Sequence, residues 1–430
     1  MKTFIIGMGT RGDVQPYVAL GLGLQKAGHE VTLCTSKNFQ PFVSEYSLSS
    51  TFIFDDVMEL LNSEEWRAAI DDTKSYWQRF NAYRKLFKLA APMQLRMLDE
   101  TWAAVQEAKP DVIVYHPKAY GVPHFAEKMG IPAILAMLVP GFVPTRAFPA
   151  VGFGFPEWKL GSWYNYGSAW IAGKLTASGV GKYIKSWRKT NGWPALSRGV
   201  DTWRTPLGRP IPVVHGYSGH VMPAPDDWPA HVSIAGYWFL DQPREWEPPV
   251  SLTSFLNAGD PPVYIGFGSM SGPKTEHVSR IVVEALQKAR VRGILATGWG
   301  GLNADQLPET IHKIDMAPHD WLFPRMAAVV HHGGAGTTAA ALRAGRPSLV
   351  CPFAMDQPFW GRRVNALGAG PAPIKQRALA VDTLAPALRE VVDREDYRKN
   401  AEIIGEKLRA EDGLGNAVQF IEAQVAGFVK

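Results

Sequence analysis

Two segments of this chain place a glycine-rich turn directly after a short apolar run. Residues 7–12, Gly-Met-Gly-Thr-Arg-Gly, follow the apolar residues 4–6, and residues 331–336, His-His-Gly-Gly-Ala-Gly, follow the apolar residues 328–330. Each turn leads into residues with helical spacing and then into a further apolar run. This repeated order predicts two doubly wound α/β domains, each with a parallel sheet covered by helices on both faces.

The length and the prolines divide the chain. A chain of 430 residues is too long for a single core, so two domains are expected. Residues 241–262 contain five prolines and are the predicted linker. The predicted domains are therefore residues 1–240 and 241–430, with a last helix at 414–428 that packs back on the first domain. Two such domains are expected to face each other across a cleft lined by the carboxyl ends of their strands.

The composition narrows the cellular setting and the partners. The two cysteines, Cys34 and Cys351, lie in separate apolar runs, which predicts buried reduced thiols and a cytoplasmic protein. The first apolar run ends at Gly7, too early for a signal peptide, and residues 131–143 are too short and too proline-rich to span a bilayer. A net charge of +5 without long basic runs suits an anionic ligand or a membrane surface and gives no indication of nucleic acid binding.

The second glycine turn predicts an anion site. The start of the following helix presents free backbone N–H groups and the positive end of its dipole, and His332 adds a ring N–H. One strand later, Asp356 and Gln357 are expected at the same sheet edge, where a carboxylate and an amide bind vicinal sugar hydroxyls. Either feature alone fits an ordinary strand-to-helix turn, but together they favour a nucleotide sugar.

Several motifs carry a resemblance to a known family over nearly the whole chain. The sequence resembles family 1 glycosyltransferases with the GT-B fold, and more narrowly the sterol glucosyltransferase-like branch, including its bacterial members. The motifs are GTRGDVQP (9–16), YHPKA (115–119), TGWGGL (297–302), PHDWLF (318–323), HHGGAGTT (331–338) and DQPFW (356–360).

The resemblance implies an inverting, metal-independent transfer of a hexose, glucose from UDP-glucose, to a hydroxyl. The nucleotide sugar is a co-substrate, and no cofactor is expected. The family's larger sterol enzymes carry membrane-binding regions upstream of the transferase; since this sequence starts at the first strand, a stand-alone enzyme of bacterial type is expected. The N-terminal domain would bind the acceptor and the C-terminal domain the donor. The implied donor-binding residues are Gly268, Ser269, Met270, Pro318, His319, Trp321, His332, Gly334, Gly336, Thr337, Asp356 and Gln357.

Two residues of the N-terminal domain are candidates for the general base that an alcohol acceptor requires. Asp13 lies where the first glycine turn meets its helix, and it matches the family's Arg-Gly-Asp loop. An Asp directly before a helix is also a preferred N-cap, and a helix start lowers a carboxyl pKa and weakens it as a base. His116 follows the apolar residues 112–115 and would orient Asp13 or serve as the base itself.

The acceptor is expected to be large and apolar. Arg11 and Gly12 in the first turn, with Phe142, Phe148 and Phe153 in a loop rich in Pro, Gly and Phe, are the predicted acceptor contacts. Such a wall suits a sterol, terpenoid or macrolide. In the alternative interpretation, nearby aromatics make peripheral contact with a membrane that holds a lipid acceptor, helped by the interleaved cations Lys159, Lys174, Lys182, Lys185 and Arg188.

Other functions fit parts of the sequence. A dinucleotide oxidoreductase requires an acidic residue after the second strand, where this chain has Thr35-Ser36-Lys37. A sugar-nucleotide epimerase would keep the donor site without an acceptor wall, and a non-catalytic nucleotide-sugar-binding protein would need only the second half. A deoxysugar transferase of antibiotic biosynthesis, using another nucleotide, also stays open, and the sequence does not indicate the oligomeric state.

Overall fold

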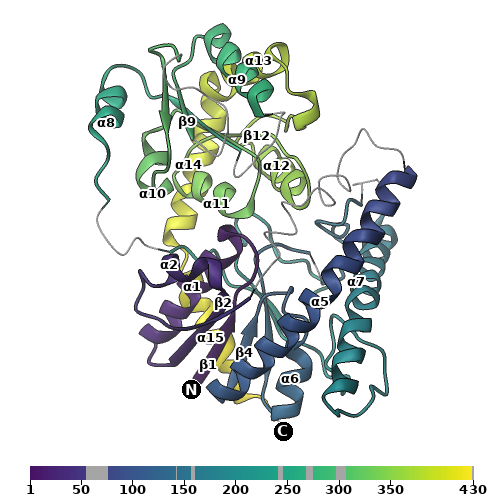
Figure 1. The fold of residues 1–430 in the computed structure, drawn as a ribbon. Helices are drawn as coiled ribbons and strands as arrows, with labels where there is room; N and C mark the ends of the chain where they lie inside the picture. The colour runs from purple at the N-terminus through teal and green to yellow at the C-terminus, as the bar shows by residue number, and fades with distance from the viewer. Residues whose placement is uncertain are drawn as a thin grey trace.

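The computed structural model describes residues 1–54, 76–141, 143–155, 160–240, 246–267, 275–296 and 307–428. Two sheets organise these residues as separate lobes (Figure 1). The strands of the first sheet are β1 (Lys2–Ile6), β2 (Glu30–Ser36), β3 (Ser49–Ile53), β4 (Val112–Tyr115), β5 (Ala133–Met137), β6 (Val213–His215) and β7 (Val232–Ile234). The strands of the second are β8 (Val263–Gly266), β9 (Gly293–Ala296), β10 (Ile311–Ile314), β11 (Ala328–His331) and β12 (Ser348–Val350).

Both sheets are parallel and doubly wound, which confirms the predicted fold class. The first has the order β3-β2-β1-β4-β5-β6-β7 and the second the order β10-β9-β8-β11-β12. In each, the order reverses beside the strand that opens the lobe, β1 or β8. Loops that leave neighbouring strands there meet at one edge, which is the usual place for a ligand in such sheets.

Helices of several lengths connect these strands. Those of the first lobe are α1 (Arg11–Lys26), α2 (Gln40–Val43), α5 (Tyr76–Ala108), α6 (Val122–Met129) and α7 (Ser162–Thr190). Those of the second are α8 (Val250–Asn257), α9 (Thr275–Ala289), α10 (His319–Leu322), α11 (Ala335–Arg343), α12 (Gln357–Ala366) and α13 (Val381–Asp393). The chain ends in α14 (Glu395–Ala410) and α15 (Gly413–Ala426). No helix within these described ranges is long and apolar enough to cross a membrane.

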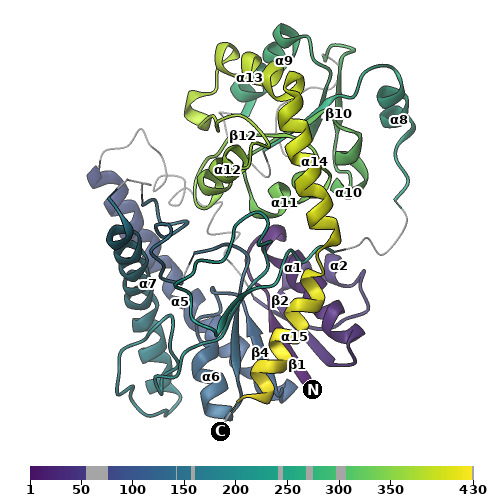
Figure 2. The same cartoon turned by 180° about the vertical axis from the view of Figure 1, so that it is seen from behind.

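The last two helices connect the lobes. α14 packs on α11 of the second lobe, and α15 packs on α1 of the first (Figure 2). Ala417, Val418 and Ile421 of α15 join the apolar core beneath β1. Within the predicted linker, α8 forms after Pro249, and its buried Leu252 packs against Tyr264 and Phe323. This part of the linker is therefore folded onto the second lobe.

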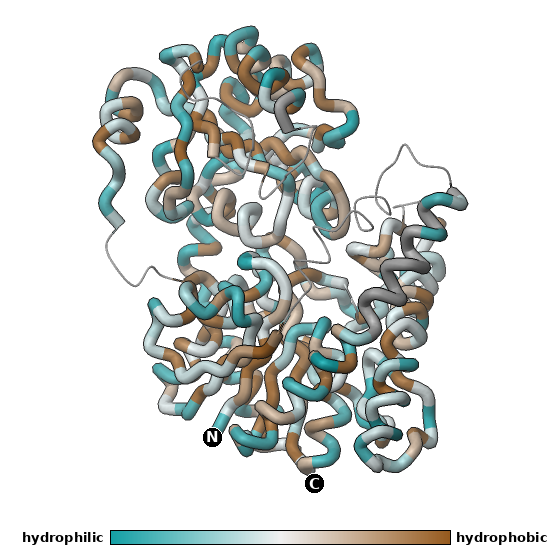
Figure 3. Tube along the Cα trace, in the orientation of Figure 1, coloured by the Kyte–Doolittle hydropathy of each residue, from teal (hydrophilic) through white to brown (hydrophobic). Residues whose placement is uncertain are grey.

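The central strands are largely apolar because both sheet faces are covered. Figure 3 shows this apolar character gathered along the strands of each lobe. Phe4, Ile5 and Ile6 of β1 are fully buried, as are Val329 and Val330 of β11. Burial on both faces holds these strands rigidly, so the loops at their carboxyl ends start from fixed positions.

Candidate functional site

The first glycine turn delivers Asp13 to the edge of the N-terminal sheet. α1 begins at Arg11, and Thr10 is its N-cap, so Asp13 is the third helical residue and not the cap that the sequence suggested. The side chain of Asp13 still caps the helix, because the Thr10 N–H donates to Asp13 Oδ2 at 2.8 Å. This is the reciprocal arrangement of a capping box, in which a Thr is followed three residues later by an acidic residue.

His116 approaches Asp13 from the neighbouring strand. β4 pairs with β1, so the residue after β4 lies beside the turn after β1. His116 Nε2 is 3.7 Å from Asp13 Oδ1, and Lys118 Nζ is 3.3 Å from Asp13 Oδ2. Burial opposes ionisation of Asp13, but the His116 ring, the Lys118 ammonium and the Thr10 N–H outweigh it, so the pKa of Asp13 lies well below its usual range.

The second glycine turn is held in a conformation that only glycine adopts easily. Gly333 has a φ of +91°, and a Cβ there would lie 2.9 Å from the Gln357 carbonyl oxygen. Gly334 is the N-cap of α11, and the first intrahelical N–H bond of the helix runs from Thr338 to the Gly334 carbonyl. The N–H groups of the first turn, including those of Gly336 and Thr337, therefore have no intrahelical partner.

Two neighbouring histidines leave buried ring nitrogens without a partner. The Gly333 N–H donates to His331 Nδ1 at 3.0 Å, and within the described residues neither His331 Nε2 nor His332 Nδ1 has a hydrogen-bond partner. Burial, with the charges of His332 and His319, lowers the pKa of His331 to about 3, and burial also lowers the pKa of His332. Both rings are neutral at pH 7, and a buried orphaned ring nitrogen is costly unless a ligand completes it.

Asp356 and Gln357 stand at the turn after β12, at the start of α12. Asp356 Oδ2 accepts from the Trp360 indole N–H at 2.9 Å, and Gln357 Oε1 accepts from the Phe353 N–H at 2.7 Å. These bonds engage Asp356 Oδ2 and Gln357 Oε1 and fix both side chains. Burial raises the pKa of Asp356 to about 6, against two hydrogen bonds that lower it, and the charge of Asp13 adds to the rise.

The same electrostatic coupling shows that the two lobes meet at these turns. Arg11 Nη1 donates to the Met316 Sδ at 3.5 Å, across 305 residues of sequence. Burial, together with the charges of Arg11 and His332, lowers the pKa of His319 to about 4. The structure thus brings Arg11 and Asp13 of the first lobe to turns that carry three of the residues predicted for the donor, His319, His332 and Asp356.

Other predicted contacts lie in packed surroundings. Trp321, which follows Pro318 at the start of α10, packs its ring against Trp246, with centroids 5.0 Å apart, and lines a hollow of about 420 Å³ beside α8. Phe148 is 9% exposed and contacts Phe359 of the second lobe, with centroids 6.0 Å apart. Its ring therefore belongs to the packing between lobes rather than to an open wall.

The remaining predicted contacts differ in their surroundings. Phe153 is 38% exposed and Gly12 is exposed, so their surfaces are open to solvent. Phe142, Gly268, Ser269 and Met270 lie outside the described residues, as do residues 297–302.

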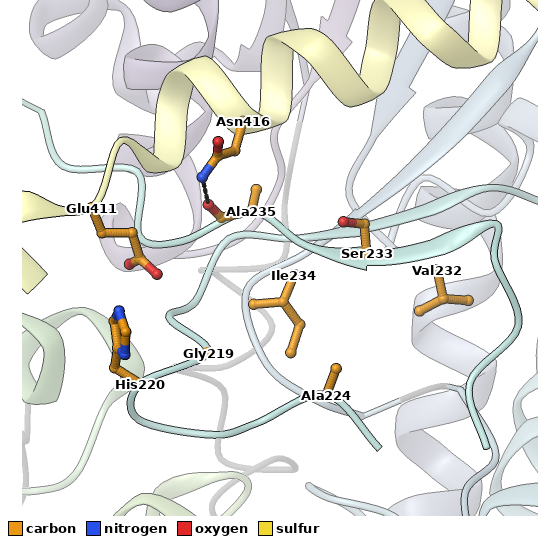
Figure 4. A pocket seen from close by; sticks show the side chains of 9 residues that line it. All are labelled: Gly219, His220, Ala224, Val232, Ser233, Ile234, Ala235, Glu411 and Asn416. Atoms are coloured by element: carbon orange, nitrogen blue, oxygen red, sulfur yellow. Dashed lines mark hydrogen bonds between the residues drawn. The ribbon is translucent and has the colours of Figure 1, made fainter. Parts of the chain in front are cut away.

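A hollow elsewhere contains none of the predicted residues. It measures about 450 Å³ and lies between β7 and the junction of α14 with α15 (Figure 4). His220 and Glu411 face each other across it, and Glu411 also accepts a hydrogen bond from Ser218 at 3.0 Å. Asn416 binds the Ala235 carbonyl at 2.9 Å at its rim. These contacts fasten the C-terminal helices to the first lobe.

Sequence reasoning missed three residues near Asp13. Thr10 had a readable signal, because Thr10 and Asp13 have capping-box spacing. Lys118 lies within the YHPKA motif but received no role, although adjacent parallel strands bring the loops after β1 and β4 together. Met316 had no signal, since its contact with Arg11 depends on how the two lobes are arranged.

Known protein families match the two halves separately. Residues 3–149 match the N-terminal domain of glycosyltransferase family 28, and residues 298–421 match the C-terminal domain of the erythromycin biosynthesis protein CIII-like family.

Curated relatives are similar along nearly the whole chain. Two sterol 3-beta-glucosyltransferases of Arabidopsis thaliana are 35% identical over 434 residues and 34% identical over 421 residues. The alignments cover 97% of this chain in both cases, and 65% and 67% of the plant proteins. A sterol 3-beta-glucosyltransferase of Aspergillus fumigatus is 35% identical over 98% of this chain and 30% of the fungal protein. The chain therefore spans about two thirds of the plant relatives and under a third of the fungal one.

Solved structures share the fold at lower identity. The glycotransferase of kitacinnamycin superposes with a TM-score of 0.72 at 20% identity, covering 99% of each chain. CalG4, the calicheamicin glycosyltransferase, superposes with a TM-score of 0.68 at 17% identity, covering 99% of this chain and 98% of its own. These superpositions show that the fold is shared over nearly the whole of each chain.

Proposed function

This chain belongs to the GT-B glycosyltransferase family that includes the sterol 3-beta-glucosyltransferases, and from that premise we propose that it transfers a hexose from a nucleotide sugar to a large apolar alcohol. The donor is UDP-glucose, and the acceptor is a sterol, terpenoid or macrolide hydroxyl. The observation that carries the proposal is the meeting of three turns. Asp13 lies opposite the Asp356 turn, and Asp356 lies beside the start of α11 with its unpartnered His332 nitrogen.

The C-terminal turns would hold the donor. The N–H groups at the start of α11 would bind the diphosphate beside the His332 ring, because a helix start stabilises the charge that develops on the leaving group. Asp356 Oδ1 would accept a hydrogen bond from one sugar hydroxyl, and the Gln357 NH₂ group would donate one to another. Both are already fixed by other contacts, so little ordering is needed when the sugar binds.

The N-terminal turn would activate the acceptor. Asp13 takes the proton of the acceptor hydroxyl while that oxygen bonds to the anomeric carbon. The bond from the anomeric carbon to the diphosphate oxygen breaks, and its electron pair leaves with the nucleoside diphosphate. A single displacement inverts the anomeric centre. Proton acceptance and charge stabilisation both come from side chains and backbone groups, so the proposed reaction has no step that needs a metal.

The nucleotide and the sugar are tested with a thermal-shift panel of UDP, TDP and their glucose and deoxysugar derivatives. A ligand that binds only the folded state at about 100 times its Kd stabilises the protein by about 2.7 kcal/mol. The proposal expects UDP-glucose to give the largest shift. A larger shift with a TDP-deoxysugar would favour an antibiotic-type transferase, an alternative supported by the match of residues 298–421 to the erythromycin CIII-like family.

The face of α7 supports peripheral contact with an anionic membrane that holds the acceptor. α7 contains five cationic residues and no acidic residue. Trp163, Trp170 and Leu175 on its first half are 78%, 51% and 63% exposed. Lys182 and Lys185 continue the exposed face, whereas the predicted contact Arg188 is buried against the Pro194 carbonyl and Lys159 lies outside the described residues. Aromatics beside lysines suit the interface of an anionic bilayer.

Vesicle co-sedimentation tests this surface directly. The protein is expected to pellet with vesicles of mixed anionic and zwitterionic lipid, less with zwitterionic vesicles, and less again after Trp163→Ser with Trp170→Ser. Equal pelleting of this double variant on anionic vesicles, or no pelleting of the wild type, would remove membrane contact from the proposal. Concentration-dependent dimerisation that the double variant abolishes would assign the face to a second copy of the chain instead.

A further inference from the structure

Lys118 contacts both residues that stand as candidates for the base. Its backbone N–H donates to His116 Nδ1 at 3.2 Å, and its ammonium lies 3.3 Å from Asp13 Oδ2. Lys118, in the loop after β4, thus contacts both Asp13 and His116.

The backbone contact determines which nitrogen of His116 carries the proton. A neutral imidazole has one donor nitrogen and one acceptor nitrogen. Because Nδ1 accepts the Lys118 N–H, the ring proton is on Nε2, which faces Asp13 Oδ1 at 3.7 Å. A protonated Nε2 cannot take a proton from an acceptor alcohol. His116 therefore acts as a donor toward Asp13, and Asp13 is the proton acceptor of the pair.

The side-chain contact divides the two oxygens of Asp13. Oδ2 accepts from the Thr10 N–H at 2.8 Å, from Thr10 Oγ1 at 3.1 Å and from Lys118 Nζ at 3.3 Å. Oδ1 faces only His116 Nε2 among the described contacts of Asp13, at 3.7 Å. Oδ2 is thus fully engaged, and Oδ1 is the oxygen left to meet an acceptor hydroxyl.

The glycine at position 9 makes room for this ion pair. Gly9 has a φ of +128°, and a Cβ there would lie 2.2 Å from Asp13 Oδ2 and 2.3 Å from Lys118 Nζ. The side chains of Lys118 and Asp13 are 45% and 29% exposed, and an ion pair so open to solvent adds little to folding stability. The close passage of the Gly9 backbone therefore serves the orientation of the pair rather than the stability of the fold.

We propose that Lys118 is a positioning residue for the transfer reaction, whose ammonium holds Asp13 Oδ2 so that Oδ1 is presented to the acceptor hydroxyl. Its backbone N–H holds His116 in the tautomer that assists this orientation. The inference rests on the proposed function, in which Asp13 is the base.

Loss of the Lys118 ammonium would change the pH dependence of the reaction through the pKa of Asp13. The titratable groups facing Asp13 are His116 and Lys118 from the loop after β4, Tyr17 from α1 and Asp356 from the second lobe. The Lys118 ammonium favours the ionised form of Asp13, whereas Tyr17 and the Asp356 carboxylate do not. Removal of the ammonium raises the pKa of Asp13, so Asp13 is protonated at higher pH and the acidic limb of kcat/KM moves to higher pH.

The experiment compares Lys118→Met, Lys118→Arg and a control, Lys26→Met, an exposed lysine at the far end of α1. Lys118→Met is expected to lower kcat about 10-fold or more, leave the donor KM within about 2-fold and move the acidic limb up by about one pH unit. Lys118→Arg keeps the charge and should restore the wild-type limb, and Lys26→Met should match the wild type throughout. An unshifted limb in Lys118→Met would overturn the proposal.

A second measurement does not depend on activity or on a folded variant. The ¹⁵N shifts of the His116 ring in the wild-type protein report its tautomer, and a proton on Nε2 is expected. A neutral ring protonated on Nδ1 would overturn the proposal. If Asp13→Asn is as active as the wild type, the proposed function fails because Asp13 is not the base. The ¹⁵N measurement still tests separately whether the Lys118 N–H donates to His116 Nδ1.

Discussion

Replacement of Asp356 with asparagine should stabilise the ligand-free protein at neutral pH while weakening its hold on the sugar. Burial raises the pKa of Asp356 to about 6, from an ordinary value near 3.8. A carboxyl with this rise in pKa costs the folded state about 3 kcal/mol when it is ionised, and partial exposure reduces this to about 1–3 kcal/mol. Asparagine keeps an oxygen for the Trp360 indole N–H and carries no charge.

The sign of the effect sets the pH window. Because the folded pKa of Asp356 is raised, the folded state holds a proton between about pH 4 and 6 that the unfolded state has lost, so stability falls as the pH rises through this range. Below pH 4 the side chain is neutral in both states. Asp356→Asn should therefore raise Tm by about 1–3 °C at pH 7.5 and leave it nearly unchanged at pH 4.

Two assays check this prediction. Thermal unfolding is followed at pH 4 and pH 7.5 for Asp356→Asn and for Asp226→Asn, an exposed carboxyl that serves as the matched control. Calorimetry with the intact nucleotide sugar should show affinity reduced about 10-fold or more, with affinity for the nucleoside diphosphate alone within about 2-fold. An unchanged Tm at pH 7.5, or an equal rise at both pH values, would refute the electrostatic reasoning.

Three further substitutions test the site. Asp13→Asn should reduce transfer by about 1000-fold or more while nucleotide affinity stays nearly intact, and wild-type-like turnover would rule Asp13 out as the base. His332→Ala should weaken binding of the donor and of the nucleoside diphosphate about 10-fold, and unchanged affinity by calorimetry would remove His332 from the diphosphate site. Gly333→Ala should lower the free energy of unfolding by about 1–3 kcal/mol, because a Cβ would meet the Gln357 backbone at a φ of +91°; a neutral effect in denaturant unfolding would contradict this.

The doubly wound fold class could be predicted because local patterns determine the strands beside the two glycine turns. The apolar run before Gly7 and the run before His331 became β1 and β11, each buried on both faces as the doubly wound prediction requires. The positions of the glycine turns followed from their spacing, since the backbone at Gly9 and Gly333 adopts positive φ values that other residues rarely take.

Side-chain contacts made over long sequence separations could not be predicted in the same way. Lys118 lies 105 residues from Asp13, and only the pairing of β1 with β4 brings them together. Likewise, Phe148 contacts Phe359 because the lobes pack there, and no local pattern indicates that contact. The contact of Trp246 with the Trp321 ring likewise could not be predicted from the residues around Trp321.

The first glycine turn shows how far spacing alone can mislead. Gly7, Gly9 and Gly12 have the spacing of a dinucleotide-binding loop, but the space that Gly9 leaves is taken by Asp13 and Lys118. A carboxylate at that place repels a pyrophosphate and suits the activation of a hydroxyl. The N–H groups that the proposal assigns to the diphosphate are in the second lobe, at the start of α11, and have no intrahelical partner.

The most direct test of the proposed function is acceptor-dependent release of nucleoside diphosphate. The protein is incubated with UDP-glucose in the presence and absence of a sterol, and UDP and glycoside are quantified together. The proposal predicts equal amounts of UDP and of a β-linked glucoside with sterol present, little UDP without it, and neither with Asp13→Asn. UDP release that does not depend on any lipophilic alcohol, or interconversion of the sugar without release, would contradict glycosyl transfer.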